Sequence, residues 1–175
     1  LDSNGAWEAV LENAYNIVVT SEINGEDTLS FMIPYRDTKR GFIDSEKKIQ
    51  IVDDIYKVRT LTDTKDSEGN LATEVYAEAE FYDLTFSVRK EEHKFDAETA
   101  EVSMAYALEG TEWSVGTVNV RTKRTWTSTE KNALSILRTV AGLHGGDLVF
   151  DCPNRLVHLL TVYGTDSGAL FAYKK

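Results

Sequence analysis

An Asn-Gly pair between two β-prone runs is the feature that most constrains the fold of this chain. Asn24 and Gly25 lie between residues 16–23 and residues 27–34, both rich in β-branched and other apolar side chains. Asparagine and glycine tolerate the positive φ angle that a tight hairpin turn requires. The pattern therefore predicts an antiparallel hairpin, whose second strand ends at Pro34 because proline cannot donate to a strand ladder.

The β pattern continues beyond the hairpin. Residues 48–52, 55–61 and 71–78 form further short β-prone runs separated by charged turns. The polar stretch 35–46 is expected to form a connecting turn or a short helix. Residues 15–78 therefore predict a five-stranded antiparallel lobe, barrel-like or sandwich-like.

The next segment, residues 79–109, has the composition of helices. Asp96 is the expected N-cap for its second half, and Glu98 and Glu101 are favourable near the positive end of a helix. Gly110 is the expected C-terminal stop. The segment predicts a helical connector.

The rest of the chain predicts a ββαββ lobe. Two strands are expected over residues 113–118 and 120–126, followed by a helix that begins at a capping box formed by Thr127 and Glu130. An apolar stripe at helical spacing follows, and the helix is expected to end at Gly142.

Two return strands complete this lobe, over residues 148–151 and 156–163. Gly145 and Gly146 lead into the first of them, and a turn at Pro153 joins the two. The order predicts one helix laid on a small antiparallel sheet.

The predicted fold class is therefore α+β, mainly antiparallel β, with a β-rich lobe over residues 1–95 and a helical connector with the ββαββ lobe over residues 96–175. The charge distribution supports two lobes. Residues 1–100 carry 22 acidic and 11 basic side chains, whereas residues 101–175 carry 7 and 8.

A net charge of −10 and a single cysteine exclude several functions. An acidic surface repels phosphate, so neither sequence-specific nucleic-acid binding nor association with an anionic membrane is expected. No apolar stretch has the length that membrane insertion requires. One cysteine cannot form an internal disulfide or a multi-thiolate zinc site.

One basic-aromatic patch stands out in the second half of the chain. An acidic protein surface, including that of a second copy, is the partner that best fits this patch. Its members, the candidate interface residues, are Arg121, Lys123, Arg124 and Trp126.

The sequence offers weak support for catalysis. His93, His144 and His158 are not at metal-ligand spacing, and His144 with Asp147 is only a weak candidate for a proton shuttle. Asp151 beside Cys152 argues against an activated thiolate. We therefore expect no catalytic residue, no metal site and no cofactor in this stretch.

A calcium loop and a carbohydrate-binding surface are two further interpretations of the sequence. Aligning Gly69 with the glycine of an EF-hand loop leaves Thr64 and Val75 at the two end positions, which lack the required ligands. Tryptophans can stack on sugars, although buried tryptophans are commoner; the three are Trp7, Trp113 and Trp126.

Three segments resemble a known family of siphophage and prophage tail-tip proteins, which includes minor structural proteins, tail-associated lysins and prophage tail endopeptidases. The first is residues 13–31, around the Asn-Gly turn. The second is Thr125-Trp126-Thr127 with the helix containing Leu134-Ser135-Ile136-Leu137. The third is Leu148-Val149-Phe150-Asp151 with residues 156–160.

The resemblance implies the N-terminal region of a baseplate hub in the virion, at the distal tip of the tail and assembled in the bacterial cytoplasm. It implies a homotrimer of the full-length protein around the tail channel, with the distal tail protein and the tape-measure protein as neighbours. Lytic or peptidase activity is expected C-terminal to this chain. The alternative is a cell-wall or peptide hydrolase with its activity in this stretch.

Overall fold

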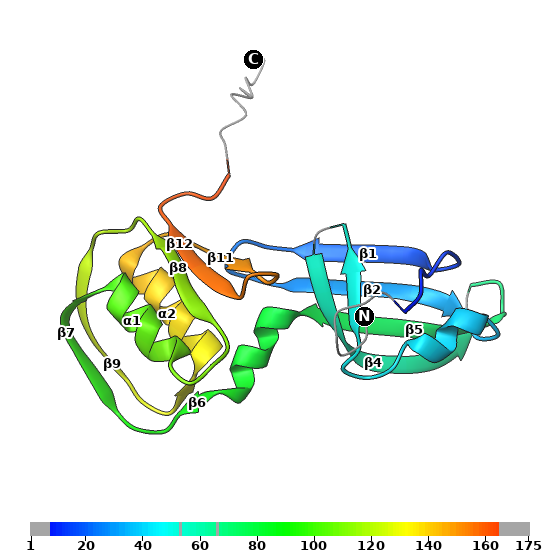
Figure 1. The fold of residues 1–175 in the computed structure, drawn as a ribbon, viewed down its shortest axis with the longest axis horizontal. Helices are drawn as coiled ribbons and strands as arrows, with labels where there is room; N and C mark the ends of the chain where they lie inside the picture. The colour runs from blue at the N-terminus through cyan, green and yellow to red at the C-terminus, as the bar shows by residue number, and fades with distance from the viewer. Residues whose placement is uncertain (1–7, 53, 66, 165–175) are drawn as a thin grey trace, which may run out of the picture.

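The computed structural model describes residues 8–52, 54–65 and 67–164. Figure 1 shows two lobes arranged along the long axis of the molecule and joined by a short helical neck. The described chain is mostly antiparallel β structure with a few helices, which confirms the predicted fold class at that level.

The first lobe is one curled five-stranded antiparallel sheet in the order β1-β2-β5-β4-β3. The hairpin expected around Asn24 is observed, with Ser21 of β1 opposite Asp27 of β2. The short helical segment η1 (Thr38–Phe42) joins β2 to β3. The strands are β1 (Tyr15–Ser21), β2 (Asp27–Pro34), β3 (Lys48–Ile51), β4 (Asp54–Lys65) and β5 (Leu71–Ala79).

Alternation of side chains places the core of this lobe on the concave face of the sheet. Leu29, Phe31 and Ile33 of β2 are almost fully buried, as the period of two predicts. Val58 of β4 and Val75 of β5 are also fully buried in the same cluster.

The predicted helical connector over residues 79–109 is wrong for its middle part. The neck η2 (Glu80–Phe86) is a 3₁₀ helix, but β6 (Val88–Arg89) and β7 (His93–Thr99) follow it. β7 pairs with β9 (Lys123–Ser128), a long-range partner that local composition does not reveal. Tertiary pairing therefore overrides helix propensity here.

Helix α1 (Ala100–Leu108) consequently begins later than predicted. Its N-cap is Thr99, whose side chain accepts a hydrogen bond from the Val102 N–H, and not Asp96, which lies within β7. Gly110 follows the helix with a φ of 70°, a conformation typical of residues just beyond a helix C-terminus.

Helix α2 (Ala133–His144) also differs at both ends from the prediction. Asn132 caps it by accepting from the Ser135 N–H, whereas Thr127 belongs to β9, so the predicted capping box is wrong. The helix continues through Gly142 and is capped by Gly145. The sequence therefore predicts this helix correctly but places both of its ends a few residues too early.

The strands of the second lobe pair differently from the expected simple antiparallel sheet. β8 (Ser114–Val118) pairs in parallel with β12 (Leu156–Leu160), and β12 pairs antiparallel with β11 (Asp147–Asp151). β10 (Lys131–Asn132) pairs with β6. The ββ unit predicted at residues 113–126 does not form, because its two strands join different sheets. The predicted division into residues 1–95 and 96–175 remains a prediction; residue 95 lies within β7.

One hydrophobic core runs through both lobes. Phe81 of the neck stacks on Phe150 of β11, with ring centroids 4.0 Å apart and planes 14° from parallel. Trp113 meets Phe150 edge-on at 6.1 Å. The neck therefore joins the two lobes by packing as well as by covalent continuity.

Candidate functional site

The tip of the β1–β2 hairpin contacts the second lobe. The Asn24 side chain accepts a hydrogen bond from the Leu148 N–H at 2.7 Å and donates to the Gly146 carbonyl at 3.4 Å. Asn24 has a φ of 59°, so asparagine suits both the backbone and the contact. The two glycine-containing turns singled out in the sequence, 24–25 and 145–146, thus lie against each other.

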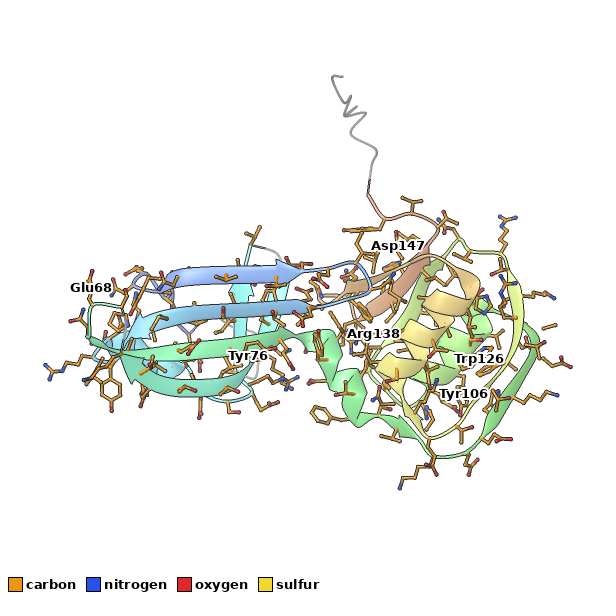
Figure 2. All side chains as sticks on the ribbon, turned by 180° about the vertical axis from the view of Figure 1, so that it is seen from behind. Glu68, Tyr76, Tyr106, Trp126, Arg138 and Asp147 are labelled. Carbon is orange, nitrogen blue, oxygen red and sulfur yellow. The ribbon has the colours of Figure 1, made fainter. Side chains whose placement is uncertain are left out.

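A second contact reinforces this junction. Arg138 of α2 donates from a guanidinium nitrogen to the Gly25 carbonyl at 2.9 Å. Its guanidinium also lies over the Tyr82 ring of the neck at 5.9 Å from the centroid. Figure 2 labels Arg138 beside the place where the lobes meet. Helix α2 is therefore fixed to the hairpin and to the neck by one side chain.

An ionic network joins the neck to the first lobe. Asp83 of η2 accepts from Lys57 at 2.7 Å and from Arg59 at 2.5 Å, both on β4. Glu46 pairs with the same two cations at 2.9 Å, and Glu78 of β5 pairs with Arg59 at 3.2 Å. The two cations are well shielded from solvent, so this network is stronger than isolated surface pairs.

Glu80 links three parts of the chain at the start of the neck. Glu80 is only 7% exposed to solvent. Its carboxylate accepts from Lys48 of β3 at 2.7 Å and from Arg155, in the β11–β12 turn, at 3.4 Å. Arg155 also pairs with Glu112. A buried carboxylate is tolerated only when paired, so Glu80 requires both lobes in place.

The ion pairs of the neck predict that the fold becomes less stable in acid. Burial raises the pKa of Asp83, but the hydrogen bonds from Arg59 and Lys57 outweigh it and hold that pKa below its ordinary value. A carboxylate whose pKa is lower in the folded state stabilises the fold at pH values above its unfolded-state pKa, about 4. This contribution is lost as the pH falls through the folded-state pKa. We expect Asp83→Asn to lower the free energy of unfolding at neutral pH by roughly 1–3 kcal/mol and to flatten its acid dependence, measured by urea unfolding at a series of pH values.

The matched control for this prediction is Glu91→Gln. Glu91 is exposed between β6 and β7, away from the neck network. Its replacement is expected to leave both the stability and its pH profile unchanged. Identical acid profiles for Asp83→Asn and the parent chain would show that the network adds nothing to stability.

The Asn24 contact predicts a measurable coupling of the lobes. Asn24→Gly keeps access to the positive φ but removes both side-chain hydrogen bonds, so we expect a loss of about 1–2 kcal/mol and faster amide exchange at Leu148. Asn24→Ala is expected to lose more, because alanine is also strained at that φ. Hydrogen exchange and urea unfolding of the two variants separate the backbone effect from the contact. Unchanged exchange at Leu148 in both variants would contradict the contact.

Trp126 of the predicted basic-aromatic patch faces the interior of the second lobe. Its ring stacks on Phe95 at 4.5 Å, and its Nε1 donates to Ser103 Oγ of α1 at 3.4 Å. The half-buried Trp126 ring is therefore engaged within the lobe, whereas Trp113 is buried. Trp7, the third tryptophan considered for sugar stacking, lies outside the described residues.

The basic members of the patch lie in and beside β9. Arg121 and Lys123 are exposed. Arg124 donates from Nε to the Leu143 carbonyl at 2.7 Å, in the last turn of α2. The C-terminal end of a helix carries a partial negative charge, so a cation at this end is stabilising. Arg124 therefore has a structural role.

The candidate thiol is poorly suited to catalysis. Cys152 lies in the β11–β12 turn near the Glu80 and Phe81 backbone, and burial raises its pKa to about 12. A thiol with that pKa is protonated at neutral pH and is a weak nucleophile. Pro153 and Asn154 complete the turn, where Asn154 donates to the Asp151 carboxylate.

The histidines have structural partners in three separate places. His144 Nδ1 lies 3.1 Å from both Oγ1 and the carbonyl oxygen of Thr122, and burial lowers the His144 pKa. His158 accepts from the Thr117 N–H at 2.8 Å. His93 stacks on Tyr106 at 4.3 Å. The partners of His144 lie in and beside β9, and they include neither Cys152 nor Asp147.

No group of three or more His, Cys, Asp or Glu side chains within residues 8–52, 54–65 and 67–164 is placed to hold a metal ion. No helix in that part of the chain has the length and apolar character to cross a membrane. The residues 63–75 considered for calcium form the end of β4, a turn and the start of β5, with Asp66 outside the described residues.

Sequence reasoning missed most of the junction. Arg138, Asp83, Glu46 and Arg155 carry no motif, because each makes contacts only with residues distant in sequence. Asn24 was identified, but for its turn conformation and not for its contact with the second lobe. The hydrogen-bonding capacity of its side chain was the one available signal.

The fold and the junction define a two-lobed, mostly antiparallel β module whose lobes are held together by hydrogen bonds, ion pairs and a shared core. Two successive family models match this chain: the prophage endopeptidase tail N-terminal domain over residues 1–79, and the prophage endopeptidase tail domain over residues 87–159. The chain belongs to this family of prophage tail proteins. No curated protein matches the sequence.

Solved structures share this fold. Prophage tail protein gp18 from Listeria monocytogenes EGD-e matches with a TM-score of 0.77 and 15% identity, over 95% of this chain and 51% of that one. A tail protein from Neisseria meningitidis MC58 matches at 0.54 and 12%, over 83% and 44%. The 43 kDa tail protein of prophage MuSo2 from Shewanella oneidensis matches at 0.53 and 13%, over 77% and 46%. The chain therefore spans about half the length of each.

Proposed function

We propose that this chain is a structural part of a phage tail-tip hub, which surrounds the tail channel and links the distal tail ring to downstream lysin or receptor-binding regions. The observation that carries the proposal is the fold shared with prophage tail protein gp18 over 95% of the chain. In this proposal the lobe before the neck and the lobe after it belong to one hub subunit, with a baseplate-hub-like arrangement in the virion.

The cross-lobe contacts fit a subunit that transmits force along a tail. The Asn24 and Arg138 contacts and the Glu80 ion pairs tie the lobes at separate points. A homotrimer is the proposed assembly of the longer protein, since cyclic symmetry lets each subunit bury surfaces that a single copy leaves open. The distal tail protein and the tape-measure protein are the proposed neighbours.

The hydrolase reading has less support in this stretch. The family description names an endopeptidase, and we place any such activity outside this chain. The raised pKa of Cys152 and the separate structural partners of His144 both argue against a catalytic pair here. Incubation of the purified chain with cell walls is expected to give no lysis; lysis that disappears on Cys152→Ser would overturn this placement.

Mass in solution tests the hub assembly. Light scattering is expected to give a monomer for residues 1–175 and a trimer for a version of the protein that continues beyond residue 175. Electron microscopy of tails carrying a tagged copy should place the label at the distal tip. A monomeric longer protein, or a label along the tail tube, would contradict the hub.

The acidity of the first lobe supplies a second test. We propose that part of its acidic surface lines the channel, where it would repel DNA and limit sticking during passage. Reversal of exposed acids of this lobe outside the described ion pairs, such as Glu22 and Glu74, is expected to impair DNA ejection while tails still assemble. Normal ejection by such tails would contradict an acidic channel lining.

A further inference from the structure

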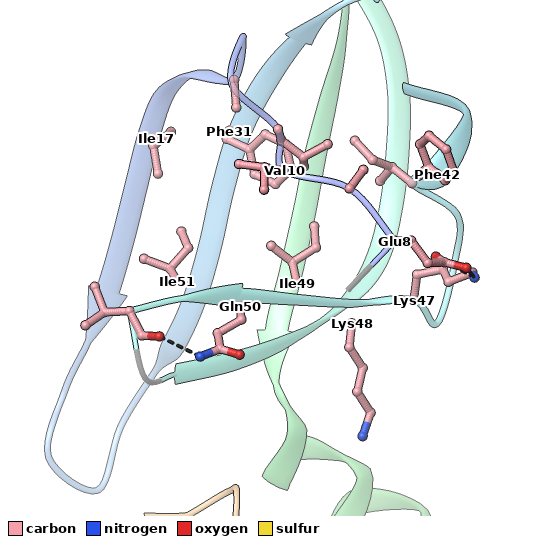
Figure 3. Close-up of a pocket in the computed structure, with 15 residues that line it drawn as sticks. Glu8, Val10, Ile17, Phe31, Phe42, Lys47, Lys48, Ile49, Gln50 and Ile51 are labelled. Carbon is pink, nitrogen blue, oxygen red and sulfur yellow. Dashed lines mark hydrogen bonds and ion pairs between the residues drawn. The ribbon is translucent and has the colours of Figure 1, made fainter. Parts of the chain in front are cut away.

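The curled sheet of the first lobe is open on one side. A cavity of about 490 Å³ lies between the segment 8–14, β1, β2 and β3. Figure 3 shows Ile17 of β1, Phe31 of β2 and Ile49 and Ile51 of β3 gathered around this space. Each bordering strand therefore contributes apolar side chains to the lining, and β3 also contributes Lys48 and Gln50.

Both edges of the opening are strand edges. In the described sheet, β1 pairs with β2 alone and β3 pairs with β4 alone, so each has one side without a neighbouring strand. An edge strand presents backbone N–H and C=O groups that another strand can pair with. The opening thus combines apolar side chains with backbone hydrogen-bonding capacity.

The β1 edge lacks the charges that usually protect an edge strand. Residues 13–21 are the longest uncharged run within the first 100 residues, which otherwise carry 22 acids. Ile17 and Val18, on β1, are 53% and 54% exposed. Natural edge strands are commonly blocked by lysine, proline or a covering segment, so an exposed apolar edge in a strongly acidic lobe indicates a binding surface.

The charges around the cavity are already paired. Lys47 contacts Glu8 at 2.9 Å, and Lys48 contacts Glu80 at 2.7 Å. A charged occupant would bring an additional charge to an apolar surface whose own charges are neutralised, which is unfavourable. Charge complementarity therefore favours an uncharged occupant.

We propose that this opening binds an extended, uncharged polypeptide segment of a partner protein. The segment adds to β1 as a further strand and places alternate apolar side chains against Phe31, Ile49 and Ile51. A lipid or a small apolar molecule would fill the cavity but could not form a strand ladder with β1. Strand addition satisfies both the apolar lining and the edge. The proposal is independent of the hub assembly, because a single copy of the chain carries the whole surface.

A synthetic strand tests the proposal directly. The probe is an end-blocked peptide of about seven residues, the length of a typical strand, with alternating valine and threonine. We expect it to bind the purified chain, with increased hydrogen-exchange protection in β1 on binding. Its control is the same peptide with N-methylated backbone amides, which keeps the apolar side chains but cannot form the ladder, and which is expected to bind at least about tenfold more weakly.

Two variants of the chain localise the binding. Ile17→Asp places a charge at the cavity and is expected to weaken peptide binding by about tenfold or more. Ile23→Asp is the matched control, because Ile23 is similarly exposed, at 58%, but lies in the hairpin loop beyond the β1 edge; it is expected to bind like the parent. Circular dichroism checks that both variants fold.

Four outcomes would overturn the proposal. Equal binding of the N-methylated peptide would show an apolar pocket without strand addition. Equal loss of binding in both variants, or protection confined to other strands, would place the binding elsewhere. Binding that appears only after removal of residues 1–7 would assign the opening to that segment of the chain.

Discussion

Gly146→Ala is expected to destabilise the chain by about 3 kcal/mol, one of the two largest effects predicted for a single substitution. Gly146 has a φ of 124°, a conformation that residues with a Cβ rarely adopt. A Cβ there would also lie 2.7 Å from the Leu160 carbonyl oxygen and 3.0 Å from Val120 Cγ2. Because the obstacle includes backbone of β12, rotation of a side chain cannot relieve it.

Gly142→Ala is the control for this substitution. Gly142 lies within α2, and a Cβ there meets no atom within 4 Å. Alanine is favoured over glycine in a helix by about 0.5–1 kcal/mol, so this variant is expected to be more stable than the parent. Thermal and urea unfolding of the two variants give the comparison. Similar effects from both substitutions would mean that the backbone around Gly146 rearranges without strain.

Phe95→Ala is expected to destabilise the second lobe by about 3–5 kcal/mol. Phe95 is 1% exposed and stacks on Trp126, with Tyr106 of α1 edge-on at 5.4 Å. Removal of the ring leaves a cavity between the β7–β9 ribbon and α1, which the surrounding helices cannot close fully. The fluorescence of Trp126 should shift to longer wavelength as water reaches the indole.

Phe86→Ala provides the matched comparison. Phe86 is 76% exposed at the end of the neck, so its removal is expected to change stability by less than about 0.5 kcal/mol. A small effect of Phe95→Ala, comparable with that of Phe86→Ala, would mean that the ribbon contributes little to the packing of the second lobe.

Patterns that depend on neighbouring residues predicted the first lobe well. The alternation in residues 27–34 and the Asn24-Gly25 turn depend only on local geometry, and the hairpin is observed with its apolar face buried. The 3₁₀ segment η1 likewise falls within the stretch expected to hold a turn or short helix. In these places local preference and tertiary structure agree.

The second lobe was less predictable because its pairings are long-range. Residues 93–99 have helical composition but form β7, since β9 supplies a strand partner from residues 123–128. The register of that pair is interrupted between Phe95 and Glu98, where Ala97 has a φ of 52°. An irregular strand of this kind has no clean period of two, so periodicity could not identify it.

The candidate site was the least predictable part. Asp83, Lys57 and Arg59 are charged residues of the kind that most often lie on a solvated surface, and only the curvature of the sheet and the position of the neck bring them together. The predicted basic patch groups Trp126 with the cations that precede it in the sequence, but the Trp126 ring stacks on Phe95 inside the second lobe, whereas Lys123 and Arg124 are exposed. Side-chain direction along a strand was predictable in principle; the identity of the covering layer was not.

The contact between Asn24 and Leu148 also constrains how the chain acquires its structure during synthesis. The two residues are 124 positions apart, and a ribosome adding about 5–20 residues per second needs roughly 6–25 s to make that stretch. The hairpin is thus complete long before its counterpart in β11 exists. During that interval water contacts the hairpin tip where the second lobe later packs. The joining of the two lobes is therefore a late event whose timing is set by translation.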